Sequence, residues 1–153
     1  MSKNKKQPIK PLSPENYVKT KVRTLPIDSC FINNDWKEAG IANIFVIRKH
    51  TTGKITFGVY LVDLFALGVK NTFFNFNQPE EILNDILNEN YIMIDYNTAH
   101  NIIYGGVEFA EENGFKTHKD FKKITQYILE PDDEGIPIIA IEFGKGGKPF
   151  VIL

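Results

Sequence analysis

The chain has 153 residues, of which 42% are hydrophobic and 24% charged, and its formal net charge is −1. This size and balance predict one globular domain with a substantial buried core, and they exclude fibrous and wholly disordered classes. The sequence shows no apolar run long enough to span a bilayer, no signal peptide in MSKNKKQPIKP and only one cysteine, Cys30. We therefore expect a cytoplasmic protein without a membrane partner.

The N-terminal segment is strongly basic. Residues 1–12 are rich in lysine, proline, asparagine and glutamine, which predicts a disordered basic arm ahead of a single domain over 13–153. Residues 1–23 hold seven basic side chains against Glu15, a net charge of +6, and the rest of the chain carries −7. The basic residues are Lys3, Lys5, Lys6, Lys10, Lys19, Lys21 and Arg23. Such segments contact phosphate backbones, although a solubilising tail, or one folded back on the acidic body, has the same composition.

Residues 13–62 contain the clearest local signals. Ser13 as N-cap and Pro14 as first helical residue predict a short helix that ends before Pro26. The stretch SCFIN predicts a strand, and DWKEAG a turn or single helical turn that stops at Gly40. Two β-branched and aromatic runs then flank the polar turn HTTGK, which predicts a central hairpin over 42–62 inside a sheet covered on both sides.

Helical patterns dominate the middle of the chain. Three helices are predicted, in NQPEEILNDILNEN, in DYNTAHNIIYGGVEFAEENG and, with Thr117 as N-cap, in THKDFKKITQYIL. The pair Gly105–Gly106 inside the second helix indicates close approach of another backbone, most simply that of the sheet, because interior glycines destabilise a helix. The final residues predict a C-terminal hairpin over 137–152. The order favours an α+β fold with a mainly antiparallel sheet and helices packed on one face.

Five residues are candidates for catalysis or metal binding. His100 and Glu108, with Tyr104 between them, have the i, i+4, i+8 spacing of one helical face. The other candidates are Asp63, His118 and Asp120. No metal-ligand motif supports them, so neither a metal nor a cofactor is predicted. Structural roles compete with three of them: backbone hydrogen bonding for His100, an exposed helix start for His118, and bonds from turn amides for Asp63.

Other chemical motifs are weaker. Cys30 lies in a strand-like run without an adjacent base, and FGKGGKPF lacks the P-loop pattern and reads as a hairpin turn, whose Lys145 and Lys148 are free to contact an acidic partner. The aromatics of NTFFNFN follow Lys70, a combination found in single-strand binders, but their spacing places at least two of them in the core.

The stretches LSPENYVKTKVRTLPI, NIFVIRKHTTGKITFGVYLVDLFALGVKNTFF, AHNIIYGGVEFAEENGFKTHKDF and IEFGKGGKPFVI resemble an uncharacterised family of bacterial proteins typical of Bacteroidetes. The resemblance covers nearly the whole chain. Members of that family tend to carry cysteine at the position of Ala66 and aspartate at that of Asn71, so a catalytic role built on that cysteine would be lost here. The family implies no activity, cofactor or catalytic residue.

Three functions remain open. The first is a non-enzymatic binding module that contacts RNA or a ribonucleoprotein through the basic arm. The second is a small metal-dependent hydrolase or nuclease, which requires Asp63 and the His100 helix face to converge. The third is a protein–protein interaction domain that uses the arm as a tether.

Overall fold

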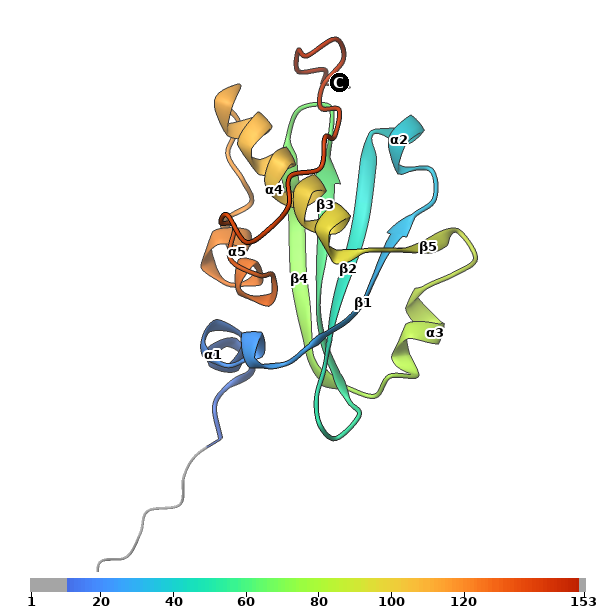
Figure 1. Cartoon of the computed structure of the whole chain (residues 1–153), viewed down its shortest axis with the longest axis vertical. Helices are drawn as coiled ribbons and strands as arrows, with labels where there is room; N and C mark the ends of the chain where they lie inside the picture. The colour runs from blue at the N-terminus through green and yellow to red at the C-terminus, as the bar shows by residue number, and fades with distance from the viewer. Residues whose placement is uncertain (1–10, 152–153) are drawn as a thin grey trace, which may run out of the picture.

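The computed structural model, which describes residues 11–151, has a five-stranded antiparallel sheet with strand order β4-β3-β2-β1-β5 (Figure 1). The strands are β1 (Ile27–Asn33), β2 (Ile41–Lys49), β3 (Ile55–Asp63), β4 (Gly68–Gln78) and β5 (Tyr91–Ile94). The helices are α1 (Pro14–Thr20), α2 (Trp36–Ala39), α3 (Ile82–Ile86), α4 (Tyr96–Glu112) and α5 (Lys119–Lys123), with 3-10 turns η1 (Val22–Thr24) and η2 (Thr125–Ile128). The α+β class with an antiparallel sheet is confirmed.

The central hairpin predicted over 42–62 is formed by β2 and β3. Their register runs without a break from Lys49↔Ile55 to Ile41↔Asp63. Side chains of both strands are buried on both faces of the sheet, as the absence of an apolar–polar alternation predicts. These two strands therefore form the middle of the sheet.

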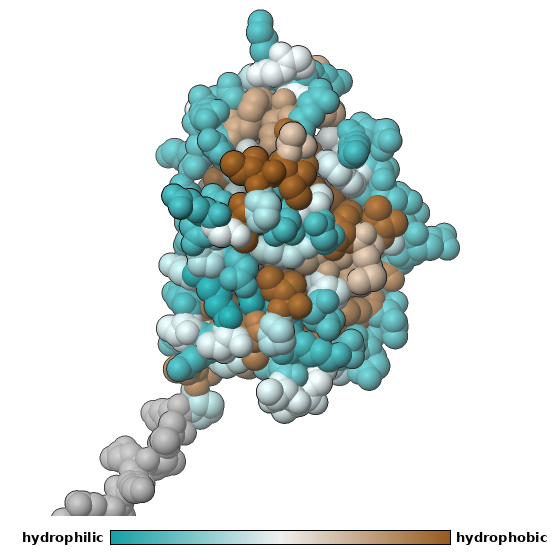
Figure 2. Space-filling model, in the orientation of Figure 1, coloured by the Kyte–Doolittle hydropathy of each residue, from teal (hydrophilic) through white to brown (hydrophobic). Residues whose placement is uncertain are grey.

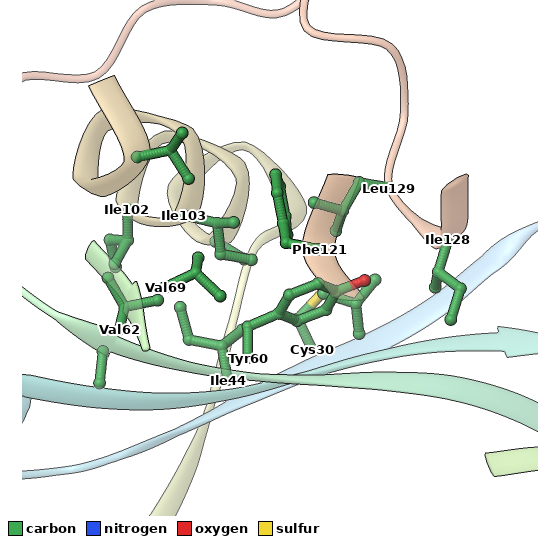
Figure 3. Close-up of a cluster of buried hydrophobic side chains, with 14 of the residues drawn as sticks. Cys30, Ile44, Tyr60, Val62, Val69, Ile102, Ile103, Phe121, Ile128 and Leu129 are labelled. Carbon is green, nitrogen blue, oxygen red and sulfur yellow. The ribbon is translucent and has the colours of Figure 1, made fainter. Parts of the chain in front are cut away.

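One face of the sheet carries most of the helices. There α1, α4, α5 and η2 cover a core of aliphatic and aromatic side chains (Figure 3). Its centre includes Ile44, Tyr60, Val69, Ile103 and Phe121, all almost completely buried. The hydroxyl of Tyr60 donates to Thr125 O at 2.6 Å, which satisfies the buried phenol and joins η2 to the sheet.

The prediction that helices pack on one face only is wrong in one respect. α3 lies against the opposite face, where Phe45, Ile47, Ile55, Phe57 and Val59 form a second buried cluster. Partly buried side chains of α3 and its surroundings pack on that cluster. Apolar side chains point alternately to both faces of β2 and β3, so the second face also needs a cover.

The helix boundaries mostly follow the predicted signals. Ser13 caps α1 by accepting from Asn16 N, and Gly40 ends α2 in the left-handed conformation, as predicted. The predicted cap Thr117 is wrong, because His118 Nδ1 accepts from Asp120 N at the start of α5. α4, with 17 residues, is the longest helix, and within 11–151 no helix combines the length and hydropathy needed to span a membrane.

Gly105 and Gly106 make two different close contacts. A Cβ on Gly106 would lie 2.8 Å from Val62 Cγ1, and one on Gly68 would lie 2.6 Å from Gly106 O. The predicted approach of the α4 backbone to the sheet is thus found at Gly106. A Cβ on Gly105 would instead lie 2.6 Å from the ring of Phe143, so this glycine accommodates the C-terminal segment.

The C-terminal hairpin predicted over 137–152 is limited to its turn. Lys145 and Lys148 form an isolated antiparallel bridge, but the residues before it make no strand. The segment 137–143 crosses α4 instead, and Phe143 stacks on Phe109 with ring centroids 6.0 Å apart (Figure 1). Packing on the helix has replaced strand pairing. Residue 152 lies outside the described residues.

β4 and β5, which were not predicted, form the two edges of the sheet. Along β4 several backbone groups that face away from β3 are hydrogen-bonded locally. Asn71 Oδ1 accepts from Thr72 N at 2.9 Å, Gln78 Nε2 donates to Phe76 O at 2.9 Å, and His118 N donates to Val69 O at 3.0 Å. The long edge strand is therefore partly closed by its own side chains and by the start of α5.

Candidate functional site

His100 lies near the start of α4 with its imidazole buried and both ring nitrogens engaged. Nδ1 is 2.7 Å from the hydroxyl of Tyr96, and Nε2 is 2.9 Å from Asp132 Oδ1. Asp132 Oδ1 accepts from Nε2–H, and in that tautomer the Tyr96 hydroxyl, which accepts from Glu130 N, donates its hydrogen to Nδ1. The partners of His100 are thus two side chains, not the backbone group that the sequence suggested.

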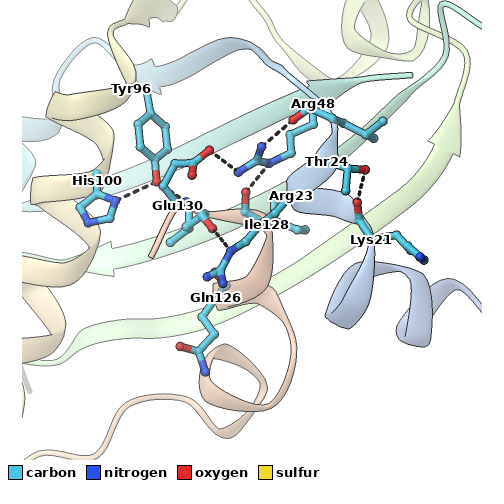
Figure 4. A network of polar contacts seen from close by, with 11 residues as sticks. Lys21, Arg23, Thr24, Arg48, Tyr96, His100, Gln126, Ile128 and Glu130 are labelled. Atoms are coloured by element: carbon cyan, nitrogen blue, oxygen red, sulfur yellow. Dashed lines mark hydrogen bonds and ion pairs between the residues drawn. The ribbon is translucent and has the colours of Figure 1, made fainter. Parts of the chain in front are cut away.

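Arg48 extends this network under the segment 128–130 (Figure 4). Its buried guanidinium donates to Leu25 O at 2.7 Å, to Ile128 O at 2.6 Å and to Glu130 Oε1 at 3.1 Å. These bonds hold the end of η2 against the sheet and fix Glu130 beside Tyr96. The only sequence signal for this residue was a charge at the end of an apolar strand.

Tyr104 and Glu108 continue the face of α4 that begins at His100, as their spacing predicts. The His100 and Tyr104 rings are 4.7 Å apart, and Glu108 lies with them along a groove of about 740 Å³ that the segment 132–138 completes. Burial raises the pKa of Tyr104 to about 12, so this phenol is protonated at neutral pH. The remaining ionisable side chains of the groove are Asp132, Asp133 and Glu134.

Asp63 lies elsewhere in the fold. Its Oδ1 accepts from Phe65 N at 2.9 Å in the turn between β3 and β4, which is the turn role predicted for it. Val62, its neighbour, points toward Gly106 of α4. Alternation along β3 therefore directs Asp63 to the opposite face of the sheet from His100.

His118 and Asp120 form the start of α5. His118 Nδ1 accepts from Asp120 N at 3.1 Å and lies 3.9 Å from Asp120 Oδ2, so the two residues are engaged with each other. His118 N also donates to Val69 O, which ties the helix start to β4. No hydrogen bond or ion pair within 11–151 joins either residue to His100 or Glu108.

The five candidates thus divide into three separate places, and only His100 and Glu108 share a surface. Within the described part of the chain, no group of three or more His, Cys, Asp or Glu side chains is arranged to hold a metal ion. Burial raises the pKa of the Cys30 thiol to about 12, which leaves almost no thiolate to act as a nucleophile at neutral pH. The groove offers buried hydrogen bonding and negative charge rather than a reactive pair.

Of the seven basic N-terminal residues, the structure describes Lys19, Lys21 and Arg23. Lys3, Lys5, Lys6 and Lys10 fall outside the described residues. Lys19 and Lys21 lie at the end of α1 and just after it, and the side chain of Lys21 points away from the polar network (Figure 4). Arg23 binds the segment around η2: its Nε donates to Leu129 O at 2.8 Å, and its guanidinium lies 5.5 Å from the centre of the Tyr127 ring.

α5 brings a second group of lysines to the same side. Residues 116–123 carry four lysines against Asp120, a net charge of +3, and α1 and α5 are joined through η2, which contacts both (Figure 1). Lys122 pairs with Glu111 at 2.6 Å. We define the basic face by the lysines on or next to α1 and α5 that make no ion pair within 11–151: Lys19, Lys21, Lys70, Lys116, Lys119 and Lys123.

A group of three partly exposed rings adjoins α1. Tyr17 lies 5.0 Å from Phe76 and 5.7 Å from His50, and the His50 and Phe76 rings are 6.0 Å apart. These residues come from α1, the β2–β3 turn and β4, so no local pattern pointed to the group. Burial lowers the pKa of His50, which favours a neutral, stackable imidazole.

Comparisons of the chain with family models, curated proteins and solved structures find no match. The resemblance to an uncharacterised bacterial family therefore stays a prediction, and functional inference rests on the geometry of the chain itself.

Proposed function

We propose that this protein is a non-enzymatic binding module that contacts RNA, alone or in a ribonucleoprotein, through the basic face and the N-terminal arm. The observation that carries the proposal is the juxtaposition of two basic segments far apart in sequence. α1, which ends near Lys19 and Lys21, and α5, which carries Lys119 and Lys123, lie on the same side of the sheet and both contact η2 (Figure 1). Lysines that gather without acidic partners suit the phosphate backbone.

The acids at the end of α4, which lie beside α5, mark one border of the basic face and support an oriented contact. Glu108, Glu111 and Glu112 occupy the last turns of α4, which has no basic residue in its final turn. Acids at this end add to the negative charge of the helix C-terminus, and together they would repel phosphates. A polyanion is thus attracted to the basic face and repelled from the acidic end of α4.

The rings beside α1 support RNA in single-stranded form. Tyr17, His50 and Phe76 stand next to the helix that follows the arm. Proteins that bind single strands combine such rings with a basic track, and each stacked base contributes about 1–3 kcal/mol. Phe73, although 49% exposed, lies on the other face of the sheet, beside Val59.

The hydrolase or nuclease alternative receives less support, because Asp63 and His100 belong to opposite faces of the sheet. The interaction-domain alternative differs from our proposal in its partner. It predicts that proteins captured from a lysate are unchanged when the arm lysines are replaced by glutamine.

Salt-dependent binding of a labelled single-stranded RNA of mixed sequence tests the proposal. Deleting residues 1–23 is unsuitable, because Val18 and Val22 are buried in the core. We instead compare the native chain with an arm variant (Lys3, Lys5, Lys6 and Lys10 to glutamine) and a face variant (Lys119→Gln with Lys123→Gln). The plot of log affinity against log salt concentration has a negative slope, and each lost phosphate contact should reduce the magnitude of that slope by about 0.7.

The matched control is Lys37→Gln with Lys145→Gln, which removes two lysines at the other end of the molecule. We expect both the arm and face variants to bind more weakly with a shallower salt dependence, and the control to bind like the native chain. Equal affinities in all four proteins, or the absence of salt-dependent binding, would refute the proposal.

A further inference from the structure

A second surface lies at the end of the sheet far from α1 and is independent of the proposed RNA contact. There α2, the β3–β4 turn, the first turn of α4 and the C-terminal segment enclose a cavity of about 680 Å³. Figure 2 shows hydrophobic side chains reaching the surface on the face that carries α4 and the C-terminal segment. The apolar wall of the cavity is formed by Trp36, Leu64, Phe65, Ile139 and Ile141.

The walls of this cavity are held in place. The ring of Phe65 packs against Gly40 so closely that an added Cβ would overlap it. Gly144 N donates to Leu64 O at 2.8 Å, and Phe150 N donates to Phe65 O at 2.9 Å, so the C-terminal segment is anchored on both sides of its turn. A preformed cavity with an apolar lining and few polar groups is typical of small-molecule sites.

The polar groups at the cavity are mainly cationic. Lys37 Nζ lies 5.3 Å from the centre of the Trp36 ring, and Lys145 Nζ lies 5.1 Å and 4.1 Å from the Phe65 and Phe150 rings. Neither lysine forms an ion pair within 11–151. Glu142 is the single acid of the lining, which therefore has a net charge of +1.

We propose that this cavity binds a small organic anion with a flat apolar body, such as an aromatic carboxylate or sulfonate. The body packs against Trp36 and Phe65, and the anionic group pairs with Lys37 and Lys145. Cation–π contacts with the aromatic rings already hold both ammonium groups at the cavity. Because these side chains are partly ordered before binding, the anion loses less free energy to ordering them.

Trp36 gives a direct assay, since it is the only tryptophan of the chain and lines the cavity. The probe is anilinonaphthalene sulfonate, whose binding is followed by energy transfer from Trp36. Phenylnaphthylamine, which has the same rings without the sulfonate, is the uncharged control. We expect saturable 1:1 binding of the sulfonate with loss of Trp36 emission.

The variants separate charge from packing. Lys37→Gln with Lys145→Gln should weaken sulfonate binding at least about fivefold, the effect of one ion pair in a water-like dielectric, and leave phenylnaphthylamine binding unchanged. Glu142→Gln should tighten sulfonate binding, and the face variant Lys119→Gln with Lys123→Gln should not alter it. Non-saturable binding, unchanged Trp36 emission or equal sulfonate affinity in the double lysine variant would overturn the proposal.

Discussion

Replacing Gly68 by alanine tests the close approach of α4 to the sheet. Gly68 has φ +62°, and its Cβ would lie 2.6 Å from Gly106 O and 3.0 Å from the Gly106 carbonyl carbon. The matched control is Gly53→Ala, because Gly53 has φ +90° and nothing lies within 4 Å of its Cβ. Both substitutions force alanine into a left-handed conformation, which costs about 1–2 kcal/mol, but only Gly68→Ala must also displace a backbone.

In Gly68→Ala, the clash with the Gly106 backbone should lower the free energy of unfolding by a further 1–3 kcal/mol, roughly the range for overpacking a well-packed core. Stiffening of the unfolded chain, about 0.4–1 kcal/mol in favour of alanine, applies to both variants and cancels in the comparison. For a chain of this length, the difference corresponds to a melting temperature lower by about 2–12 °C.

Urea unfolding followed by circular dichroism measures both free energies of unfolding, provided that the slopes agree. If Gly68→Ala and Gly53→Ala have free energies of unfolding within about 0.5 kcal/mol of each other, half of the smallest expected overpacking cost, the proposed contact does not constrain the fold.

Three further predictions follow from single contacts. Asp63→Ala should lower the free energy of unfolding by about 0.5–1.5 kcal/mol, because it removes the acceptor of the hydrogen bond from Phe65 N. Asp63→Asn keeps an acceptor, so its free energy of unfolding should fall less in the same urea assay. Arg48→Leu should cost about 3–5 kcal/mol, since two backbone carbonyls lose charge-assisted donors, and an unchanged urea midpoint would contradict this. Burial raises the pKa of Cys30 to about 12 from 9.0, so the native state retains this proton when the unfolded state has lost it. Its contribution to stability should therefore decline as the pH rises above 9.0, and Cys30→Ala should show a flatter alkaline decline of urea midpoints.

Local chemistry explains what the sequence predicted well. The β2–β3 hairpin follows from two β-branched runs around a polar turn, and the role of Asp63 follows from an acid placed where a strand ends. The glycine pair also signalled close approach, although sequence alone did not show that Gly105 and Gly106 meet different partners.

The features that the sequence did not predict depend on tertiary packing. β4 contains asparagines between its phenylalanines, which obscured the strand pattern, and the apolar residues 137–143 pack on α4 although they resemble a strand. The rings of Tyr17, His50 and Phe76 meet only because three separate elements converge. Likewise Arg48 binds carbonyls 23 and 80 residues away along the chain, a partnership that no spacing rule predicts.

The bonding along the outer edge of β4 bears on self-association. An exposed edge strand of 11 residues is normally a template on which a second chain adds by backbone pairing. Here Asn71, Gln78 and His118 already occupy backbone groups at three points, so an incoming strand would have to break existing bonds before forming new ones. Addition of a second chain's strand at the β4 edge, and with it fibril-like growth, is therefore disfavoured. Partners are expected to bind through side-chain surfaces instead.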